Sequence, residues 1–311
     1  MLSRTAENLY WTGRYMERAE NLARLLDVSF RAALLPAADA GPAADWQAAL
    51  DMLGITEIYK TKYGNVTQDS VIVFLTLDTS HPFSIKFCID QARENARALR
   101  ATLSAELWES LNITWLEMNN ITRQILASRG PRTIFDWVKE RSHLFRGVAY
   151  STLLHNDAFH FLRLGTHLER ADNTARLLAA KERSLASLPP KSGTVYYQWG
   201  AVLRSVSAFR AYTLIYRDVI DPVRVAELLI LKAEMPRSLR FCLDQIAASL
   251  DTLAMGRDLE CRRIAMETQS RLTYSRIEHV ESQGIDAFLT DTLGRVNMLG
   301  IQIGRDFLMT V

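Results

Sequence analysis

Hydrophobic residues recur with a helical period along nearly the whole chain. In the first element the apolar side chains fall on one wide arc at about 100° per residue: Trp11, Tyr15, Met16, Ala19, Leu22, Ala23 and Leu26. Pro82 and Pro236 each stand where the pattern predicts that a helix begins, in the first turn, where the missing N–H of proline costs no hydrogen bond. The pattern breaks at 35–45 and 187–193, each time after a long helix. We therefore expect an all-α protein with roughly a dozen helices and no sheet.

The same pattern occurs twice. Residues 13–26 read GRYMERAENLARLL, and residues 165–178 read GTHLERADNTARLL. HPFSIKFCIDQ at 81–91 returns at nearly the same offset as MPRSLRFCLDQ at 235–245. Aromatic residues between these segments are matched as well: Trp46 with Trp199, Tyr59 with Tyr212, and Tyr63 with Tyr216. The order and offset of these matches predict an internal duplication with a period near 153 residues, much longer than a solenoid repeat.

The duplication defines the predicted domains. We expect two multi-helix halves, 1–150 and 151–311, related by a pseudo-twofold axis and packed together as one globular unit. One segment conflicts with this scheme, because VIVFLTL at 71–77 has strand propensity. Its counterpart VAELLIL at 225–231 is typical of a helix, and we let the duplication decide in favour of helix.

The repeated helix carries a polar face opposite its apolar arc. That face holds Gly13, Glu17, Glu20, Asn21 and Arg24 in the first copy, and Gly165, Glu169, Asp172, Asn173 and Arg176 in the second. Three interpretations are open: a solvated face with ion pairs of about 0.3–0.5 kcal/mol each, a satisfied polar network in the interior, or an active site. Because both halves share the feature, we favour the interior network, in which Glu17 pairs with Arg24 and Glu169 with Arg176 near the pseudo-twofold axis.

Another charged segment occurs in the first half only. After FCIDQ the first half continues as ARENARALRATLSAELWESLN at 92–112, whereas the second half continues after FCLDQ as IAASLDTLAMGRDLE. Arg93, Arg97 and Arg100 form an i, i+4, i+7 stripe that can grip a carboxylate or phosphate bidentately. The alternative is a solvated basic face that neighbouring glutamates balance. A duplicated fold that keeps such polar residues in only one of its halves can form a single site away from the pseudo-twofold axis.

Three long motifs connect the chain with a known family. They are LSRTAENLYWTGRYMERAENLARLL at 2–26, ARENARALRATLSAELWESLN at 92–112 and FLRLGTHLERADNTARLL at 161–178. Through them the chain closely resembles the bacterial alpha-E family, whose biochemical function is unknown, over essentially all 311 residues. Members of that family are typically encoded beside, or fused to, circularly permuted ATP-grasp ligases, with transglutaminase-like peptidases and a proteasome-related peptidase as frequent neighbours. The resemblance implies a role in making or processing amide bonds in peptides. The chain departs from the family pattern at Thr12 and Thr166.

The resemblance implies candidate site positions but no established catalytic residue. The family's signature polar residues fall on Glu17, Arg18, Asn21, Arg93, Glu94, Asn95, Arg97, Glu169 and Arg170. The candidate catalytic carboxylates are Glu17, Glu94 and Glu169. The candidate substrate-binding residues are Arg18, Asn21, Arg24, Arg93, Asn95, Arg97, Arg170 and Asn173.

Composition and the absence of certain motifs argue against nucleic-acid binding, membrane insertion and secretion. A net charge of +2 makes no electrostatic case for nucleic acid or an anionic membrane, and the longest apolar run, 71–75, is too short to span a bilayer. Arg4 and Glu7 stand where a signal peptide needs apolar residues, and three cysteines without CxxC make no disulfide framework, so we expect a cytoplasmic protein. Cys88 and Cys242 fit small buried thiols.

Metal and nucleotide chemistry lack their usual signatures. A di-iron centre needs Glu-x-x-His on two helices, which the sequence does not offer, and no P-loop, GxGxxG or GxSxG motif occurs. His160 and His167 lie on the apolar arc and fit packed core histidines better than metal ligands. We expect no metal and no cofactor, and the chain is not itself an ATP-grasp ligase.

Two functions of different classes remain. We expect an accessory, or catalytic, partner of an ATP-grasp-type amide ligase, with a transglutaminase-like peptidase as a further partner. The alternative is a free-standing enzyme for an anionic small substrate, with the Arg93 stripe as clamp and Glu94 or Glu17 as acid or base. Aromatic residues interleave with Arg14 near the N-terminus, which leaves RNA binding as a weaker third interpretation.

Overall fold

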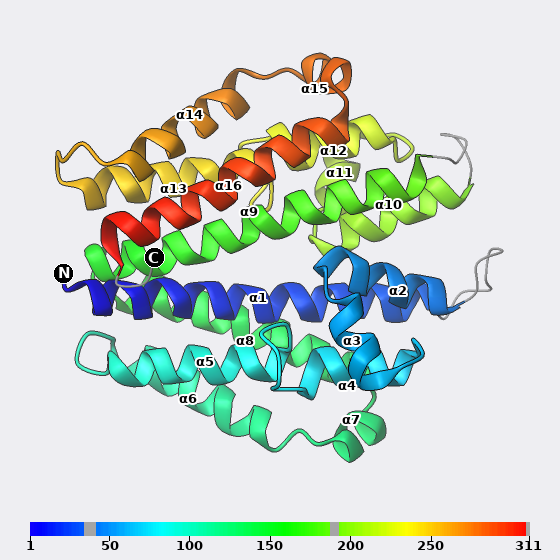
Figure 1. Cartoon of the computed structure of the whole chain (residues 1–311), viewed down its shortest axis with the longest axis horizontal. Coiled ribbons are helices and arrows are strands. Elements are labelled where there is room, and N and C mark those ends of the chain that lie inside the picture. The colour runs from blue at the N-terminus through cyan, green and yellow to red at the C-terminus, as the bar shows by residue number, and fades with distance from the viewer. Residues whose placement is uncertain (34–41, 187–192, 309–311) are drawn as a thin grey trace. The chain divides into compact units, whose positions relative to one another are not determined.

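Helices form nearly all of the structure, a computed structural model that describes residues 1–33, 42–186 and 193–308 (Figure 1). The first eight are α1 (Ser3–Ala33), α2 (Pro42–Leu53), α3 (Thr56–Tyr63), α4 (Gln68–Leu77), α5 (Ile85–Ala98), α6 (Ala105–Asn119), α7 (Arg123–Arg129) and α8 (Pro131–Thr152). The next eight are α9 (Asp157–Leu185), α10 (Gly193–Ser205), α11 (Phe209–Tyr216), α12 (Pro222–Leu231), α13 (Leu239–Ala254), α14 (Glu260–Tyr274), α15 (Ile277–Gln283) and α16 (Ile285–Phe307). The described ranges contain no strand, so the predicted all-α class is confirmed.

The described ranges contain sixteen helices, more than the predicted dozen. The helices α3, α7, α11 and α15 have only seven or eight residues, too few to show a 3.6-residue period over several turns. The predicted breaks at 35–45 and 187–193 extend too far, because residues 42–45 lie in α2 and Gly193 begins α10. The rest of each predicted break, residues 35–41 and 187–192, lies outside the described residues.

Helix lengths repeat in the same order in the two halves. The first eight helices have 31, 12, 8, 10, 14, 15, 7 and 22 residues. The next eight have 29, 13, 8, 10, 16, 15, 7 and 23 residues. Two copies of one fold would have such lengths. Duplication itself stays a prediction, which superposition of the two halves tests.

Matched tyrosines make the same local contact. The hydroxyl of Tyr59 donates a hydrogen bond to the carbonyl of Asn65 at 3.1 Å, and that of Tyr212 donates to the carbonyl of Val219 at 3.0 Å. Both rings are almost fully buried. The matched residues therefore anchor the same turn after α3 and after α11.

Pro82 and Pro236 precede the helices that they were predicted to start. The helices α5 and α13 begin one residue after Ser84 and Ser238, which act as N-caps. Each serine hydroxyl accepts a hydrogen bond from the backbone N–H three residues on, at 3.1 and 3.0 Å. The predicted placement was wrong because a serine cap satisfies a free N–H of the first turn, so each proline remains in the turn before the helix.

The segment with conflicting signals is helical. Residues 71–77 lie in α4, whose N-cap Thr67 accepts from the backbone N–H of Ser70 at 3.3 Å. Val71 and Phe74 of this helix are fully buried. Burial of this apolar helix outweighs the strand propensity of its β-branched residues, as the matched segment predicted.

Contacts divide the chain into two compact units, and each is described by itself. One unit comprises residues 11–159, and the other comprises residues 1–10 with 160–311. The predicted halves, 1–150 and 151–311, assign residues 1–10 and 151–159 differently, because they follow the sequence repeat rather than contacts.

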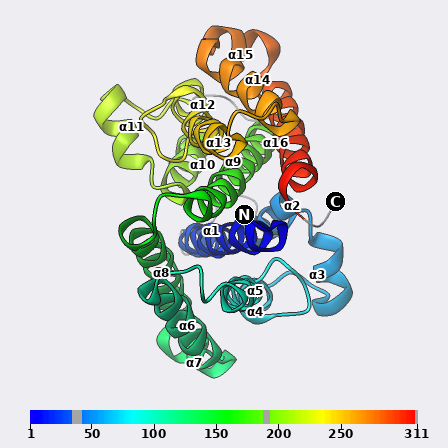
Figure 2. The ribbon, with the colours of Figure 1, turned by 90° about the vertical axis from the view of Figure 1, so that its left-hand side faces the viewer.

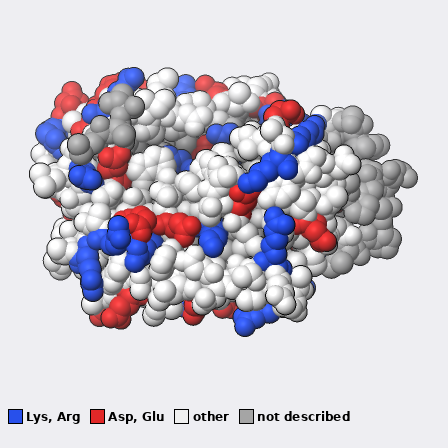
Figure 3. Space-filling view, turned by 60° about the horizontal axis from the view of Figure 1, so that its bottom comes forward, with Lys and Arg blue, Asp and Glu red and all other residues white. Residues whose placement is uncertain are grey.

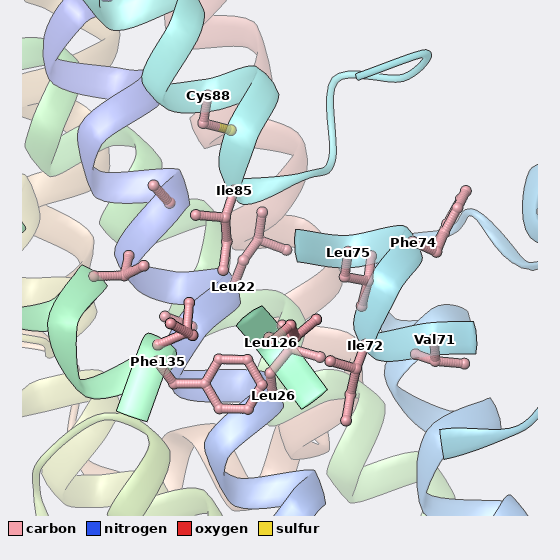
Figure 4. Close-up of a cluster of buried hydrophobic side chains, with 14 of the residues drawn as sticks. Leu22, Leu26, Val71, Ile72, Phe74, Leu75, Ile85, Cys88, Leu126 and Phe135 are labelled. Atoms are coloured by element: carbon pink, nitrogen blue, oxygen red, sulfur yellow. The ribbon is translucent and has the colours of Figure 1, made fainter. Parts of the chain in front are cut away.

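The core of the 11–159 unit lies between helices that are distant in sequence. The helix α5 packs on α6, and α6 packs on α8 (Figure 2). Leu22 and Leu26 of α1, Ile72 of α4, Ile85 of α5 and Phe135 of α8 belong to one buried hydrophobic cluster (Figure 4). Packing of α1 against α8 positions the polar groups described below.

The other unit has the corresponding neighbours. The helix α13 packs on α14, and α14 packs on α16 (Figure 2). Cys88 in the first unit and Cys242 in this one are both fully buried and outside any disulfide, which confirms them as buried thiols. Among the described helices, none combines the length and the apolar character that crossing a bilayer needs.

Candidate functional site

A buried carboxylate on α1 is the centre of a polar cluster in the 11–159 unit. Glu20 has a completely buried side chain. Its Oε1 accepts a hydrogen bond from Nε of Arg24 at 2.8 Å, and its Oε2 accepts from Oγ of Ser142 at 2.8 Å. Nη1 of Arg146 also donates to Oε2, and the Nε2 atom of His143 lies 3.5 Å from Oε1. Several donors on one carboxylate offset the cost of burying its charge.

Glu17 joins the same cluster through α8. Its Oε2 lies 3.2 Å from Nη1 of Arg146, and its side chain is also completely buried. Arg24, which was predicted to pair with Glu17, pairs with Glu20 at 2.7 Å. Arg146 was not among the predicted partners, because a helical wheel shows which residues share a face, but not which of them a neighbouring helix approaches. A buried network around this face does exist in the first half.

The matching pair in the second half lies at the surface. Arg176 donates to Asp172 at 2.8 and 3.0 Å, and the side chain of Arg176 is 43% exposed. The predicted interior position of Arg176 is therefore wrong. Glu169 is nevertheless 6% exposed and thus buried, in the unit that contains residues 160–311.

The remaining candidates of the repeated helix are held by local contacts. The guanidinium of Arg18 lies over the rings of Tyr15 and Phe83, at 5.7 and 5.9 Å from their centroids. Arg170 is buried and donates to the carbonyl of Pro236 at 3.3 Å. Asn21 is buried and Asn173 is half-buried. Arg18 and Arg170 thus both anchor the turn before the helix that follows Ser84 or Ser238.

The arginine stripe of α5 stacks on tryptophans of α6. The Cζ atom of Arg93 lies 4.4 Å from the ring centroid of Trp115 and 5.6 Å from that of Trp108. Arg100 lies 5.5 Å from Trp108. Trp108 and Trp115 are seven residues apart on α6 and share one face, while Arg93 lies in α5 and Arg100 lies in the turn after its end at Ala98. Each cation–π contact contributes about 0.5–1 kcal/mol. We call these four residues the Arg–Trp ladder.

Glu94 lies between two arginines beside the ladder. Its carboxylate is 2.5 Å from Nη1 of Arg93 and 2.9 Å from Nη2 of Arg97. Arg93 also donates from Nε to Asn112 at 3.4 Å, while Arg97 is 63% exposed and Asn95 is half-buried. The structure therefore brings these predicted residues together, but an incoming anion has to displace Glu94.

The second half has a different face at this position. At an offset of 154, Gln269 matches Trp115 and Asp244 matches Asp90. Gln269 donates a hydrogen bond to Asp244 at 2.8 Å, and Trp115 donates one to Asp90. Burial raises the pKa of Asp90 above its usual value, against the opposing effects of a hydrogen bond from Trp115 and the charge of Lys86. The polar contact is thus kept while the aromatic surface occurs only in the first half.

An open hollow of about 530 Å³ lies elsewhere, on α14 of the unit that contains 160–311. It is lined by Asp258, Leu259, Arg262, Arg263, Met266, Glu267 and Ser270. None of the predicted site residues lines it. Its arginines are already paired, since Arg262 contacts Asp251 at 2.7 Å and Arg263 contacts Glu260 at 2.5 Å.

Metal binding has no support within the part of the chain that the structure describes. There, no group of three or more His, Cys, Asp or Glu side chains is placed to hold an ion.

Charges of both signs lie beside one another on the face shown in Figure 3, without a single-sign patch.

Sequence reasoning did not select the α8 residues of the cluster. Ser142, His143 and Arg146 match Val296, Asn297 and Gly300 at an offset of 154, so they escape a search for repeated residues. A usable signal was the spacing of basic residues along 132–146, which returns to one face of the helix.

Comparison with known proteins gives one family and distant relatives. Residues 1–308 match the model of the Alpha-E family, described as "a predicted alpha-helical domain with a conserved ER motif". The Glu-Arg dipeptide occurs at 17–18, 140–141, 169–170 and 182–183. No solved structure matches the chain.

The curated relatives are longer than this chain. "Uncharacterized protein Mb2597" of Mycobacterium bovis and "Uncharacterized protein Rv2567" of Mycobacterium tuberculosis are each 25% identical over 330 residues. These alignments cover 94% of this chain and 35% of each relative. The chain thus spans about a third of the length of the curated relatives that it matches.

Proposed function

The chain belongs to the Alpha-E family, and from that premise we propose that it is a non-ATP-binding partner of an ATP-grasp-type ligase in the formation or processing of peptide amide bonds. The resemblance stated above supplies the ligase as the partner class. The longer relatives support the idea of partnership, because in them the matched segment is one part of a larger polypeptide.

The observation that carries the proposal is the exposure of three apolar side chains close together in sequence, on and just after α11. Leu214, Ile215 and Val219 are 63%, 50% and 66% exposed. Large apolar side chains that water reaches are typical of protein interaction sites when they form a patch. At the offset of 153 that matches Tyr212 with Tyr59, the first half has the polar residues Thr61 and Lys62 in place of Leu214 and Ile215, so this exposed apolar pair occurs in α11 but not in α3.

The candidate carboxylates support binding more than acid–base catalysis. Glu17 is completely buried beside Arg146, and Glu94 is paired with both Arg93 and Arg97. A general base must be able to reach the proton that it removes. Carboxylates held in such pairs are better suited to positioning other groups.

Co-purification with the ligase encoded nearest to this chain tests the proposal. The wild-type chain should retain the ligase, and mass spectrometry of the ligase products should differ with and without the chain. The double variant Leu214→Thr/Ile215→Lys carries the residues of the first half and should lose the ligase while keeping its fold. Unchanged products together with no association would remove the proposal.

The alternative enzyme for an anionic small substrate is favoured by one observation. Arg100 is exposed, stacks on Trp108 and forms no ion pair among the described residues, and Arg97 beside it is also exposed. Titration with glutamate or inorganic phosphate, followed by tryptophan fluorescence, tests this alternative, since Trp108 reports on the ladder directly. Turnover by the isolated chain would favour the enzyme.

A further inference from the structure

One face of α8 is lined with charged residues. At about 100° per residue, Arg132, Asp136, Lys139, His143 and Arg146 fall within an arc of roughly 80°. The distance from Arg132 to Arg146 along the helix is about 21 Å, since each residue rises about 1.5 Å. The face is therefore long and narrow.

A complementary face of α1 lies against it. Asp27 accepts from Nζ of Lys139 at 3.0 Å, from Arg31 at 3.0 Å and contacts Arg132 at 3.5 Å. Further along, Glu20 and Glu17 contact Arg146, as described above. We call this the α1–α8 seam: Glu17, Glu20, Arg24, Asp27 and Arg31 with Arg132, Asp136, Lys139, Ser142, His143 and Arg146.

Burial separates the two signs of charge in the seam. The acidic side chains Glu17, Glu20 and Asp27 are 0%, 0% and 9% exposed. The basic side chains Arg31, Arg132, Lys139, His143 and Arg146 are 46%, 45%, 16%, 55% and 27% exposed. Asp136, at 50%, is the exposed acidic residue of the seam. The solvent-facing rim is therefore basic, although the seam as a whole is nearly neutral.

The buried carboxylates hold the rim cations in place. Burial alone would raise the pKa of Asp27, but hydrogen bonds from Arg31 and Lys139 outweigh it and the pKa is lowered. Asp27 thus stays ionised at neutral pH and continues to orient its three basic partners. Side chains that are already oriented lose less entropy when they bind a ligand than free surface lysines or arginines do.

Three polar α8 residues of the seam have no polar or charged equivalent of the same kind in the second half. Positions that match Ser142, His143 and Arg146 hold Val296, Asn297 and Gly300. A purely structural contact between the first and the last helix of each half would not need these polar residues in one half only.

We propose that the α1–α8 seam is the docking surface for an acidic peptide segment of the partner ligase. The inference rests on the proposed function for the identity of that partner. An extended peptide rises about 3.3 Å per residue, so about six residues span the seam, and alternate carboxylates about 6.6 Å apart point to the same side. Charge complementarity favours carboxylates over a phosphate backbone, because the chain has a net charge of only +2 and Asp136 interrupts the row of cations.

The test measures fluorescence anisotropy with end-capped, rhodamine-labelled ten-residue peptides. The probe alternates glutamate and serine, and its control alternates glutamine and serine. The glutamate peptide should bind more tightly, and binding should weaken as salt rises from 50 to 200 mM. A labelled decauridylate serves as the nucleic-acid comparison.

Two variants assign the binding to the seam. Arg31→Gln/Arg132→Gln removes two half-exposed rim cations outside the buried Glu20 cluster and should weaken the glutamate peptide about three- to tenfold. Arg141→Gln is the control, because Arg141 lies on the opposite side of α8 and pairs with Glu117. Equal affinity for the two peptides, equal loss in both variants, or tighter binding of decauridylate each overturns the proposal. No ligase is present in this assay, so its failure is distinct from failure of the ligase to co-purify.

Discussion

The Glu20 cluster predicts a large difference between two chemically similar substitutions. Glu20→Gln removes a charge from an ion pair whose side chains are 0% and 10% exposed. Asp172→Asn removes the matched charge from a pair whose side chains are 18% and 43% exposed. Both changes keep the size of the side chain, and both disrupt an i,i+4 pair with arginine.

The expected magnitudes follow from the two environments. Breaking a buried ion pair costs about 3–5 kcal/mol, because the remaining charge is left in a medium of low polarity. We expect about 3 kcal/mol for Glu20→Gln, at the lower end, because Arg146 is 27% exposed and water can partly solvate it. The exposed pair contributes about 0.3–0.5 kcal/mol, so Asp172→Asn should have little effect.

Hydrogen exchange with mass spectrometry measures the loss of stability separately for the peptides of α1 and α8. A chain with two compact units need not unfold in one step, so a single melting temperature is a poor measure. A loss of about 3 kcal/mol corresponds to roughly hundredfold faster exchange for peptides of α1 and α8 that open with the unit. If Glu20→Gln and Asp172→Asn differ by less than about 0.5 kcal/mol in urea unfolding and exchange, the buried cluster does not stabilise this unit as argued.

Three further predictions follow from individual positions. Burial lowers the pKa of His81 in the folded chain, so the unfolded chain binds this proton more readily. The free energy of unfolding should therefore fall as the pH drops below about 6.5, the ordinary pKa of histidine. His81→Met, which introduces the residue found at the matched position 235, should flatten this pH dependence in urea titrations. Arg97→Ala should weaken ligase association or substrate binding but change hydrogen exchange of α5 peptides by less than about threefold, because its side chain is 63% exposed. A much larger acceleration of exchange would contradict this. Gly130→Ala, at φ 80°, should cost about 1–3 kcal/mol, whereas Gly147→Ala inside α8 should stabilise by about 0.5–1 kcal/mol; calorimetry that shows the same sign for both would refute the assignment.

Some features were predictable because they depend on local periodicity. Apolar residues at a 3.6-residue period define long amphipathic helices whatever their neighbours are, so α1 and α9 were expected from sequence. Comparison of matched segments also settled 71–77 as helix, where propensity alone favoured a strand. The predicted number of helices was too low, and short helices such as α3, α7, α11 and α15 are hard to count from sequence, since one or two turns carry no measurable period.

The candidate site was predictable in composition but not in pairing. Local spacing was sufficient to place Glu94 beside Arg97, because contacts at i,i+3 follow from helix geometry alone. The contact of Glu94 with its sequence neighbour Arg93 does not follow from that spacing. The tryptophans that stack on Arg93 come from the next helix, and spacing along α5 contains no information about them.

Packing between distant helices decided the rest. Glu20 contacts Arg146, which is 126 residues away, and Asp27 contacts Lys139, which is 112 residues away. The sequence by itself determined that a polar face exists on α1 and that it is repeated on α9. Only the tertiary structure decided that this face is buried against basic residues of α8 in the first half, while Arg176 remains exposed in the second. The physical reason is that a helical period fixes the direction of a side chain around its own axis, whereas its partner depends on which other helix packs there.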